Sequence, residues 1–98
     1  MNFYGDSYCN ITVTSKCIIC DGSYDKGFVE RIKTIPHLER EWDSEQKQWR
    51  VQLKHLDFIK EIAKESYRRV WLYENNITTD LNTGEYINSL FASMEVQS

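Results

Sequence analysis

Alternating apolar and polar positions predict a β-hairpin over residues 38–53. Successive side chains of a strand point to opposite faces, so residues two apart share a face. The positions that share one face here are Leu38, Arg40, Trp42, Trp49, Val51 and Leu53. The residues between the two tryptophans are all polar, and Asp43 followed by Ser44 is typical of a turn because short oxygen side chains bond the backbone ahead of them. The pattern therefore places Trp42 and Trp49 opposite or diagonal to each other across a turn.

A second strand segment precedes this hairpin, over residues 8–20, where β-branched residues are dense. Ser15 and Lys16 in its middle fit a turn or a bulge, so one bent strand and a tight hairpin are both consistent with the sequence. The run Asp-Gly-Ser at 21–23 then breaks the strand.

Two helices are predicted from apolar residues at helical spacing. Apolar residues recur at intervals of four and three from Phe28 to Ile35, which favours a short helix over 24–34. Pro36 ends it, because the residue before a proline is kept out of the helical conformation. A longer pattern predicts a second helix over 55–73. Its apolar stripe consists of Leu56, Ile59, Ile62, Ala63, Tyr67, Val70 and Trp71.

These elements together predict an α+β fold. A turn-rich link over 79–84 follows the long helix, and a last helical pattern covers 85–93. We therefore predict a β-α-β-β-α domain over 8–73, in which two helices cover one face of a small three-stranded sheet. An extension over 74–98 would carry a short C-terminal helix.

The charge of the chain is unevenly distributed. The net charge is −3, but residues 31–69 hold ten Lys or Arg against seven Asp or Glu, which leaves −6 on the remainder. Only the middle of the chain can therefore present a basic surface. No run approaches the roughly 18 apolar residues that cross a bilayer, and the first ten residues lack the basic and apolar parts of a signal peptide. We expect a cytoplasmic protein that makes no contact with a membrane.

The segment IKTIPHLEREWDSEQKQWRVQL, followed by a helix, resembles the small modules found beside helicase motors, the HARP-like domains of annealing helicases among them. The likeness covers about residues 10–72. Two positions depart from the family pattern: His37 replaces the glycine after the proline, and Glu41 stands before Trp42, where arginine is usual. The matching positions are Ile35, Pro36, Arg40, Trp42, Asp43, Lys47, Trp49 and Val51.

This resemblance implies a helicase-associated accessory module that binds single-stranded or forked DNA and is not itself a motor. The chain contains no G-x-x-x-x-G-K-[ST] motif, and so no phosphate-cradling loop of an ATPase. Binding to such DNA requires cationic groups for phosphates and aromatic rings for base stacking. The candidate nucleic-acid-binding residues are Arg40, Lys47, Arg50, Arg68 and Arg69, with Trp42 and Trp49.

A purely structural role and a second function stand beside this hypothesis. Tryptophans that flank a hairpin turn usually pack against a helix, and a face of mixed charge is usually only solvated. The second function is that of a small phage-type protein-interaction factor, an inhibitor or adaptor that docks on a host protein. The net charge supports it, because nucleic acid would repel the acidic, tyrosine-bearing ends of the chain and a basic protein would not. The tyrosines are Tyr4, Tyr8, Tyr24 and Tyr86.

The three cysteines predict free thiols, because their number is odd and their spacing is not that of a disulfide framework. Cys9, Cys17 and Cys20, with His37 and His55, supply the ligand types of a zinc site. However, an offset of three residues points Cys17 and Cys20 to opposite faces of a strand, and no second C-x-x-C is present. No nucleophile with a matched base and no pair of carboxylates stands out. We expect no metal, no cofactor and no enzymatic activity.

Overall fold

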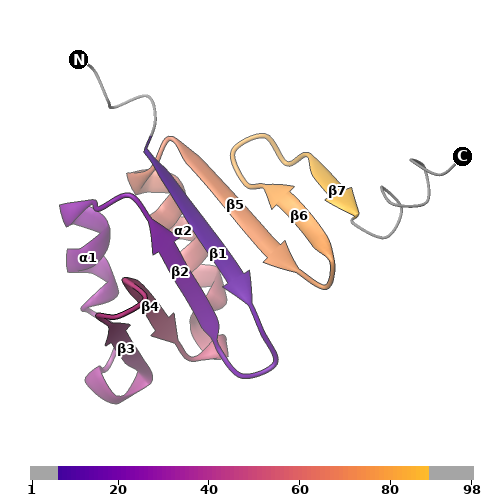
Figure 1. Ribbon diagram of the computed structural model, residues 1–98. Helices are drawn as coiled ribbons and strands as arrows, with labels where there is room; N and C mark the ends of the chain where they lie inside the picture. Colours follow the sequence, from indigo (N-terminus) through magenta and orange to yellow (C-terminus); the bar gives the residue numbers. More distant parts are fainter. Residues whose placement is uncertain (1–6, 89–98) are drawn as a thin grey trace, which may run out of the picture.

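Seven strands and two helices make up the structure, a computed structural model that describes residues 7–88 (Figure 1). In chain order they are β1 (Tyr8–Val13), β2 (Ile18–Gly22), α1 (Lys26–Ile32), β3 (Arg40–Asp43), β4 (Gln48–Val51), α2 (Leu56–Ser66), β5 (Arg69–Glu74), β6 (Ile77–Asp80) and β7 (Tyr86–Asn88). Short 3-10 turns, His37–Glu39 and Leu53–His55, precede β3 and α2. All strands belong to one sheet in the order β3-β4-β2-β1-β5-β6-β7.

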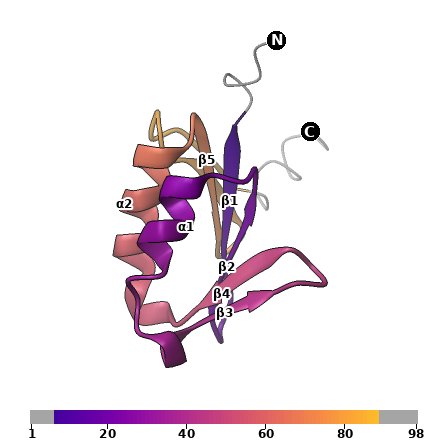
Figure 2. The same ribbon diagram turned by 90° about the vertical axis from the view of Figure 1, so that its left-hand side faces the viewer.

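The sheet is mixed because one of its pairs is parallel. β1 runs parallel to β5, with Tyr8 opposite Arg69, and every other neighbouring pair is antiparallel. Each helix is a crossover between strands that run in the same direction: α1 leads from β2 to β3, and α2 leads from β4 to β5. Figure 2 shows both helices on the same side of the sheet. The other side is left without a covering element among residues 7–88.

The core lies between the helices and one face of the central strands. Alternation along the strands sends every second side chain into this layer. An ion pair between Arg31 and Glu65 joins the two helices at the surface. The buried residues are Cys9, Ile11, Ile18, Cys20, Phe28, Ile32, Ile35, Trp49, Val51, Ile59, Ile62, Ala63, Tyr67, Val70 and Leu72.

The structure confirms the predicted β3–β4 hairpin, the strand segment over 8–20 and the first helix, which are elements that the pattern of neighbouring residues determines. β3 pairs with β4 as a hairpin, and the segment 8–20 is a hairpin of β1 and β2 rather than one bent strand. The first helix forms within the predicted range, and Asp25 caps it by accepting a hydrogen bond from the Phe28 N–H at 2.8 Å. Leu38 and Leu53 are exceptions, because both lie in 3-10 turns and are exposed instead of belonging to the strands.

The predicted helix over 55–73 is too long. α2 ends at Ser66, Tyr67 is extended, and Arg69–Glu74 form a strand. Tyr67, Val70 and Trp71 fit the helical stripe, but Val70 and Leu72 also alternate with Trp71 and Tyr73, as in a strand. Pairing with β1 on one side and β6 on the other decides between the two patterns. No helix within residues 7–88 combines the length and the apolar character needed to cross a membrane.

The predicted three-stranded sheet is wrong, although the fold is α+β. The order strand, helix, hairpin, helix is present from β2 to α2, but β1, β5, β6 and β7 join the same sheet. Residues 86–88 of the predicted C-terminal helix form strand β7, and residues 89–93 lie outside the described part of the chain. The parallel pairing of β1 with β5 joins segments about 60 residues apart, which short-range periodicity does not report.

Two glycines provide a matched test of this topology. Gly22 has φ +139° at the end of β2, and a Cβ there would lie 2.3 Å from the Tyr8 carbonyl oxygen of β1. Gly84 also has a positive φ, but a Cβ there would meet no atom within 4 Å. We expect Gly22→Ala to lower the free energy of unfolding by about 2 to 4 kcal/mol and Gly84→Ala by about 1 kcal/mol, measured by urea denaturation. Equal losses would contradict the close approach of β1 and β2.

Candidate binding site

The β3–β4 hairpin brings its two tryptophans together. Trp42 and Trp49 are directly opposite, with ring centroids 5.2 Å apart and planes tilted by 57°. The Gln52 N–H donates to the Glu39 carbonyl at 3.1 Å, which makes that opposite pair a hydrogen-bonded one. Alternation along the ladder then places Trp42 and Trp49 at a non-hydrogen-bonded pair, where the side chains of facing residues are closest. The predicted cross-strand aromatic pair is confirmed.

Asp43 forms the hairpin turn, as the sequence predicted. Its Oδ1 accepts hydrogen bonds from the backbone N–H groups of Glu45 and Gln46, each at 3.0 Å. The bond from Gln46 is the largest cause that holds the pKa of Asp43 below its usual value; the Glu45 N–H and the Arg50 guanidinium act in the same direction. Lys47 completes the turn with φ +58°.

The two tryptophans have different environments. Trp49 is 8% exposed and belongs to the core, whereas Trp42 is 48% exposed. Trp71, which the predicted helix placed in the core, lies on β5 on the face away from the helices, next to buried Val70 and Leu72, and is only partly buried. Of the three indoles, only Trp49 is therefore fully part of the packed interior.

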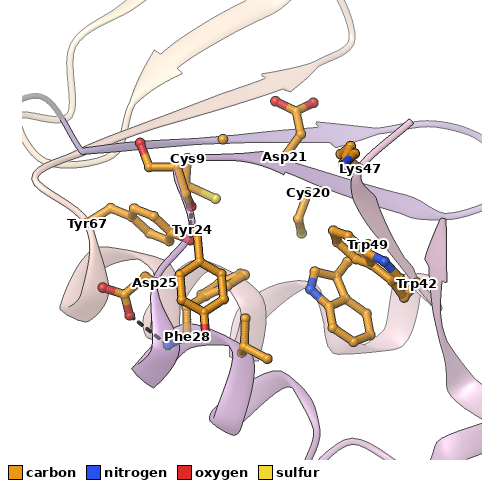
Figure 3. A pocket seen from close by; sticks show the side chains of 13 residues that line it. Cys9, Cys20, Asp21, Tyr24, Asp25, Phe28, Trp42, Lys47, Trp49 and Tyr67 are labelled. Atoms are coloured by element: carbon orange, nitrogen blue, oxygen red, sulfur yellow. Dashed lines mark hydrogen bonds between the residues drawn. The ribbon is translucent and has the colours of Figure 1, made fainter. Parts of the chain in front are cut away.

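Trp42 forms one wall of a pocket of about 280 Å³ between the hairpin and α1 (Figure 3). Tyr24 and Phe28 stand on the opposite side, and Cys20 lies between the two walls. Tyr24, just before α1, is 79% exposed. The remaining lining residues are Cys9, Asp21, Gly22, Ser23, Asp25, Val29, Lys47, Trp49 and Tyr67.

Few charged groups are directed into the pocket. Asp21 borders it, but its carboxylate points away from the pocket (Figure 3). Its Oδ1 accepts a hydrogen bond from Asn10 Nδ2 at 3.0 Å. The Asp25 carboxylate is held by the N–H of Phe28. The Tyr67 hydroxyl donates to the Ser23 carbonyl at 2.8 Å, and burial raises its pKa well above the usual value. Among the described residues 7–88, Lys47 from the hairpin turn is the one cation that lines this mostly apolar pocket.

The two thiols that line the pocket, Cys9 and Cys20, are unreactive as nucleophiles because burial keeps them protonated. Burial raises the pKa of Cys9 to about 12, with a smaller effect of the nearby Asp21 carboxylate. Burial likewise raises the pKa of Cys20 well above its usual value. Both remain protonated at neutral pH, whereas a nucleophile or metal ligand must be a thiolate. Within residues 7–88, no three His, Cys, Asp or Glu side chains come together as a metal site.

The structure does not gather the predicted phosphate-binding residues on one surface. Arg40 Nε donates to the Ile35 carbonyl at 2.9 Å, so this guanidinium caps the end of the α1 segment. Arg50 is paired with Asp43 at 2.9 Å and points to the open face of the sheet. Arg68 and Arg69 lie at the start of β5, and Figure 2 shows the hairpin turn, which carries Lys47, projecting elsewhere. Trp42, Lys47 and Trp49 line one pocket, and Arg40 and Arg50 line a separate hollow of about 270 Å³.

The open face of the sheet is also not basic. Strand alternation and register place two arginines there, Arg50 and Arg69, against four acidic residues. The acidic residues are Asp21, Glu41, Asp43 and Asp80. Tyr8, Trp71 and Tyr73 lie on the same face. This surface offers aromatic contact area with an excess of negative charge.

Sequence reasoning did not identify the pocket itself. Trp42, Lys47 and Trp49 were candidates, but Tyr24 and Phe28 face them only because α1 crosses from β2 to the hairpin. One signal was present in the sequence: an aromatic residue, Tyr24, stands between the polar turn at 21–23 and the helix, outside the apolar stripe.

No protein-family model, no curated protein and no solved structure matches this chain. The resemblance to HARP-like modules therefore stays a prediction. The function has to be inferred from the pocket and from the distribution of charge.

The two hairpin tryptophans should contribute differently to the stability of the fold, because Trp49 is buried and Trp42 is half exposed. We expect Trp49→Ala to lower the free energy of unfolding by about 3 to 5 kcal/mol, because it leaves a cavity in the core. Trp42→Ala should cost about 1 kcal/mol, mainly the lost aromatic pair. Leu38→Ala, at an exposed position before β3, is the control and should stay within about 0.5 kcal/mol of the parent. Denaturant titration measures all three, and a Trp42→Ala loss as large as that of Trp49→Ala would contradict the assignment.

Proposed function

We propose that this chain is a non-enzymatic protein-interaction module whose pocket between α1 and the β3–β4 hairpin holds an apolar side chain of a partner protein. The observation that carries the proposal is the pair of exposed aromatic walls, Trp42 and Tyr24, above an apolar floor. Aromatic residues of this kind are enriched among the residues that dominate protein–protein binding energies.

The chemistry of the floor favours an apolar side chain over a nucleobase. A base inserted here would bury nitrogen and oxygen atoms against Phe28, Val29 and two protonated thiols, Cys9 and Cys20. Polar groups buried without partners cost about 1 to 3 kcal/mol each. An aliphatic or aromatic side chain carries no such cost and gains from the exclusion of water.

The distribution of charge supports the same proposal. The net charge is −3, and the open face of the sheet carries more acidic than basic residues. Such a chain attracts basic proteins and repels a phosphate backbone. Binding to single-stranded or forked DNA stays a prediction. Two of its candidate residues already have partners within the chain: Arg40 donates to the Ile35 carbonyl, and Arg50 is paired with Asp43.

Photo-cross-linking from the pocket tests the proposal. A photoreactive benzoylphenylalanine replaces Tyr24 in one version of the chain and Leu38 in a second, because both positions are exposed and only Tyr24 lines the pocket. Each version is irradiated in cell extract with and without nuclease. We expect a nuclease-resistant, protease-sensitive adduct from position 24 and little of it from position 38.

Competition with unlabelled chain tests whether the adduct depends on the pocket. Excess parent chain and excess Leu38→Ala chain should both suppress the adduct, whereas Trp42→Ala chain should not. An adduct that nuclease removes would favour the DNA hypothesis, as would tight, salt-sensitive binding of forked DNA at about 50 mM salt. Equal adducts from positions 24 and 38, or full competition by Trp42→Ala, would also overturn the proposal.

A further inference from the structure

A second hollow lies at the other end of the sheet and shares no residue with the pocket at the hairpin. It has a volume of about 420 Å³ and is formed by β5, β6 and the turn that leads into β7. Figure 1 shows these elements at the end of the sheet away from the β3–β4 hairpin. Trp71 and Asp80 face each other across β5 and β6, so their side chains lie on the same face of the sheet. Its lining residues are Trp71, Thr78, Asp80, Gly84, Glu85 and Tyr86.

The turn that closes this hollow is held by its own hydrogen bonds. The Asp80 N–H donates to the Glu85 carbonyl at 2.8 Å, and the Gly84 N–H donates to the Asp80 carbonyl at 2.7 Å. Asn82 ties the turn to β5, because its Oδ1 accepts from the Val70 N–H at 2.9 Å. The aromatic and acidic residues are therefore positioned before any ligand arrives, which reduces the entropic cost of binding.

Among residues 7–88, no ion pair balances the negative charge of this hollow. Asp80 Oδ1 accepts the Asn82 N–H at 2.9 Å, and within residues 7–88 neither Asp80 nor Glu85 takes part in an ion pair. Arg69 precedes Trp71 by two residues on the same face but is not among the lining residues. Tyr86 also borders the hollow, but it pairs with Thr79, so strand alternation directs its ring to the face opposite Trp71, and Trp71 supplies the aromatic ring of the site.

We propose that this hollow binds an alkylammonium group, such as a lysine side chain of a partner with or without N-methyl groups. The face of an indole ring, here that of Trp71, attracts a cation, and a nearby carboxylate adds a direct charge interaction. An anionic ligand would meet two carboxylates, and a neutral apolar ligand would gain nothing from them. This site does not depend on the pocket beside Trp42, so either proposal can fail alone.

A pair of small probes of nearly equal shape tests the inference. Choline carries a trimethylammonium group, and 3,3-dimethyl-1-butanol is its neutral carbon analogue. Each is titrated into the ¹⁵N-labelled chain while the indole N–H signal of Trp71, assigned through Trp71→Phe, is followed by NMR. We expect choline to shift this signal and to bind about fivefold or more tightly than the neutral analogue. The indole signals of Trp42 and Trp49 should not move.

Two carboxamide variants provide the control. Asp80→Asn keeps an oxygen that can accept the Asn82 N–H and should weaken choline binding by about two- to fivefold, the size of an exposed charge interaction. Glu45→Gln removes an exposed carboxylate from the hairpin turn and should have no effect. Three results would overturn the inference: no shift with choline, equal binding of the neutral analogue, or equal effects of Asp80→Asn and Glu45→Gln.

Discussion

Burial of one face of the sheet beneath α1 and α2 is the constraint on which the rest of the structure depends. Ile11, Ile18 and Val70 are wholly buried in this layer, and the free energy gained from such burial is the main term that stabilises a domain of this size. Both helices lie on the same side, so no element within residues 7–88 covers the other face (Figure 2). Because side chains alternate along each strand, every buried residue of β1, β4 and β5 has neighbours that face outward. The same strand pairing that buries the core residues therefore also brings the aromatic and acidic side chains together on the open face.

The pocket lies where the hairpin diverges from α1. The hairpin directs Trp49 into the core and leaves Trp42 at the border, although the two residues are directly opposite in the ladder. Trp49 stabilises the fold, and Trp42 presents an aromatic surface beside Tyr24. The arginines that a DNA-binding hairpin would use instead contact groups of the chain itself, the carbonyl of Ile35 and the carboxylate of Asp43. The contacts of Arg40 and Arg50 thus occupy much of the positive charge of the hairpin, whereas Trp42 stays exposed beside Tyr24.

Features set by neighbouring residues could be predicted from the sequence, and features set by distant pairing could not. The Trp42–Trp49 pair follows from strand alternation and the Asp43 turn, and the first helix follows from the spacing of its apolar residues, although the sequence did not single out Asp25 as its N-cap. The boundary between α2 and β5 was predicted wrongly because Val70 and Trp71 fit both the helical and the strand period. Only the pairing of β5 with β1, which starts at Tyr8 opposite Arg69, decides between the two periods. The pocket combines residues from both hairpins, from α1 and from the C-terminal end of α2, so no single stretch of sequence indicates it.

The central claim is that the hairpin buries one indole and exposes the other, and fluorine NMR tests it on the chain with all three tryptophans present. The chain is labelled with 5-fluorotryptophan, and the three signals are assigned with single Trp→Phe variants. The change in each chemical shift between H₂O and D₂O measures the contact of that indole with solvent. Trp42 should respond strongly and Trp49 hardly at all, with Trp71 between them. A response of Trp49 as large as that of Trp42 would contradict the account.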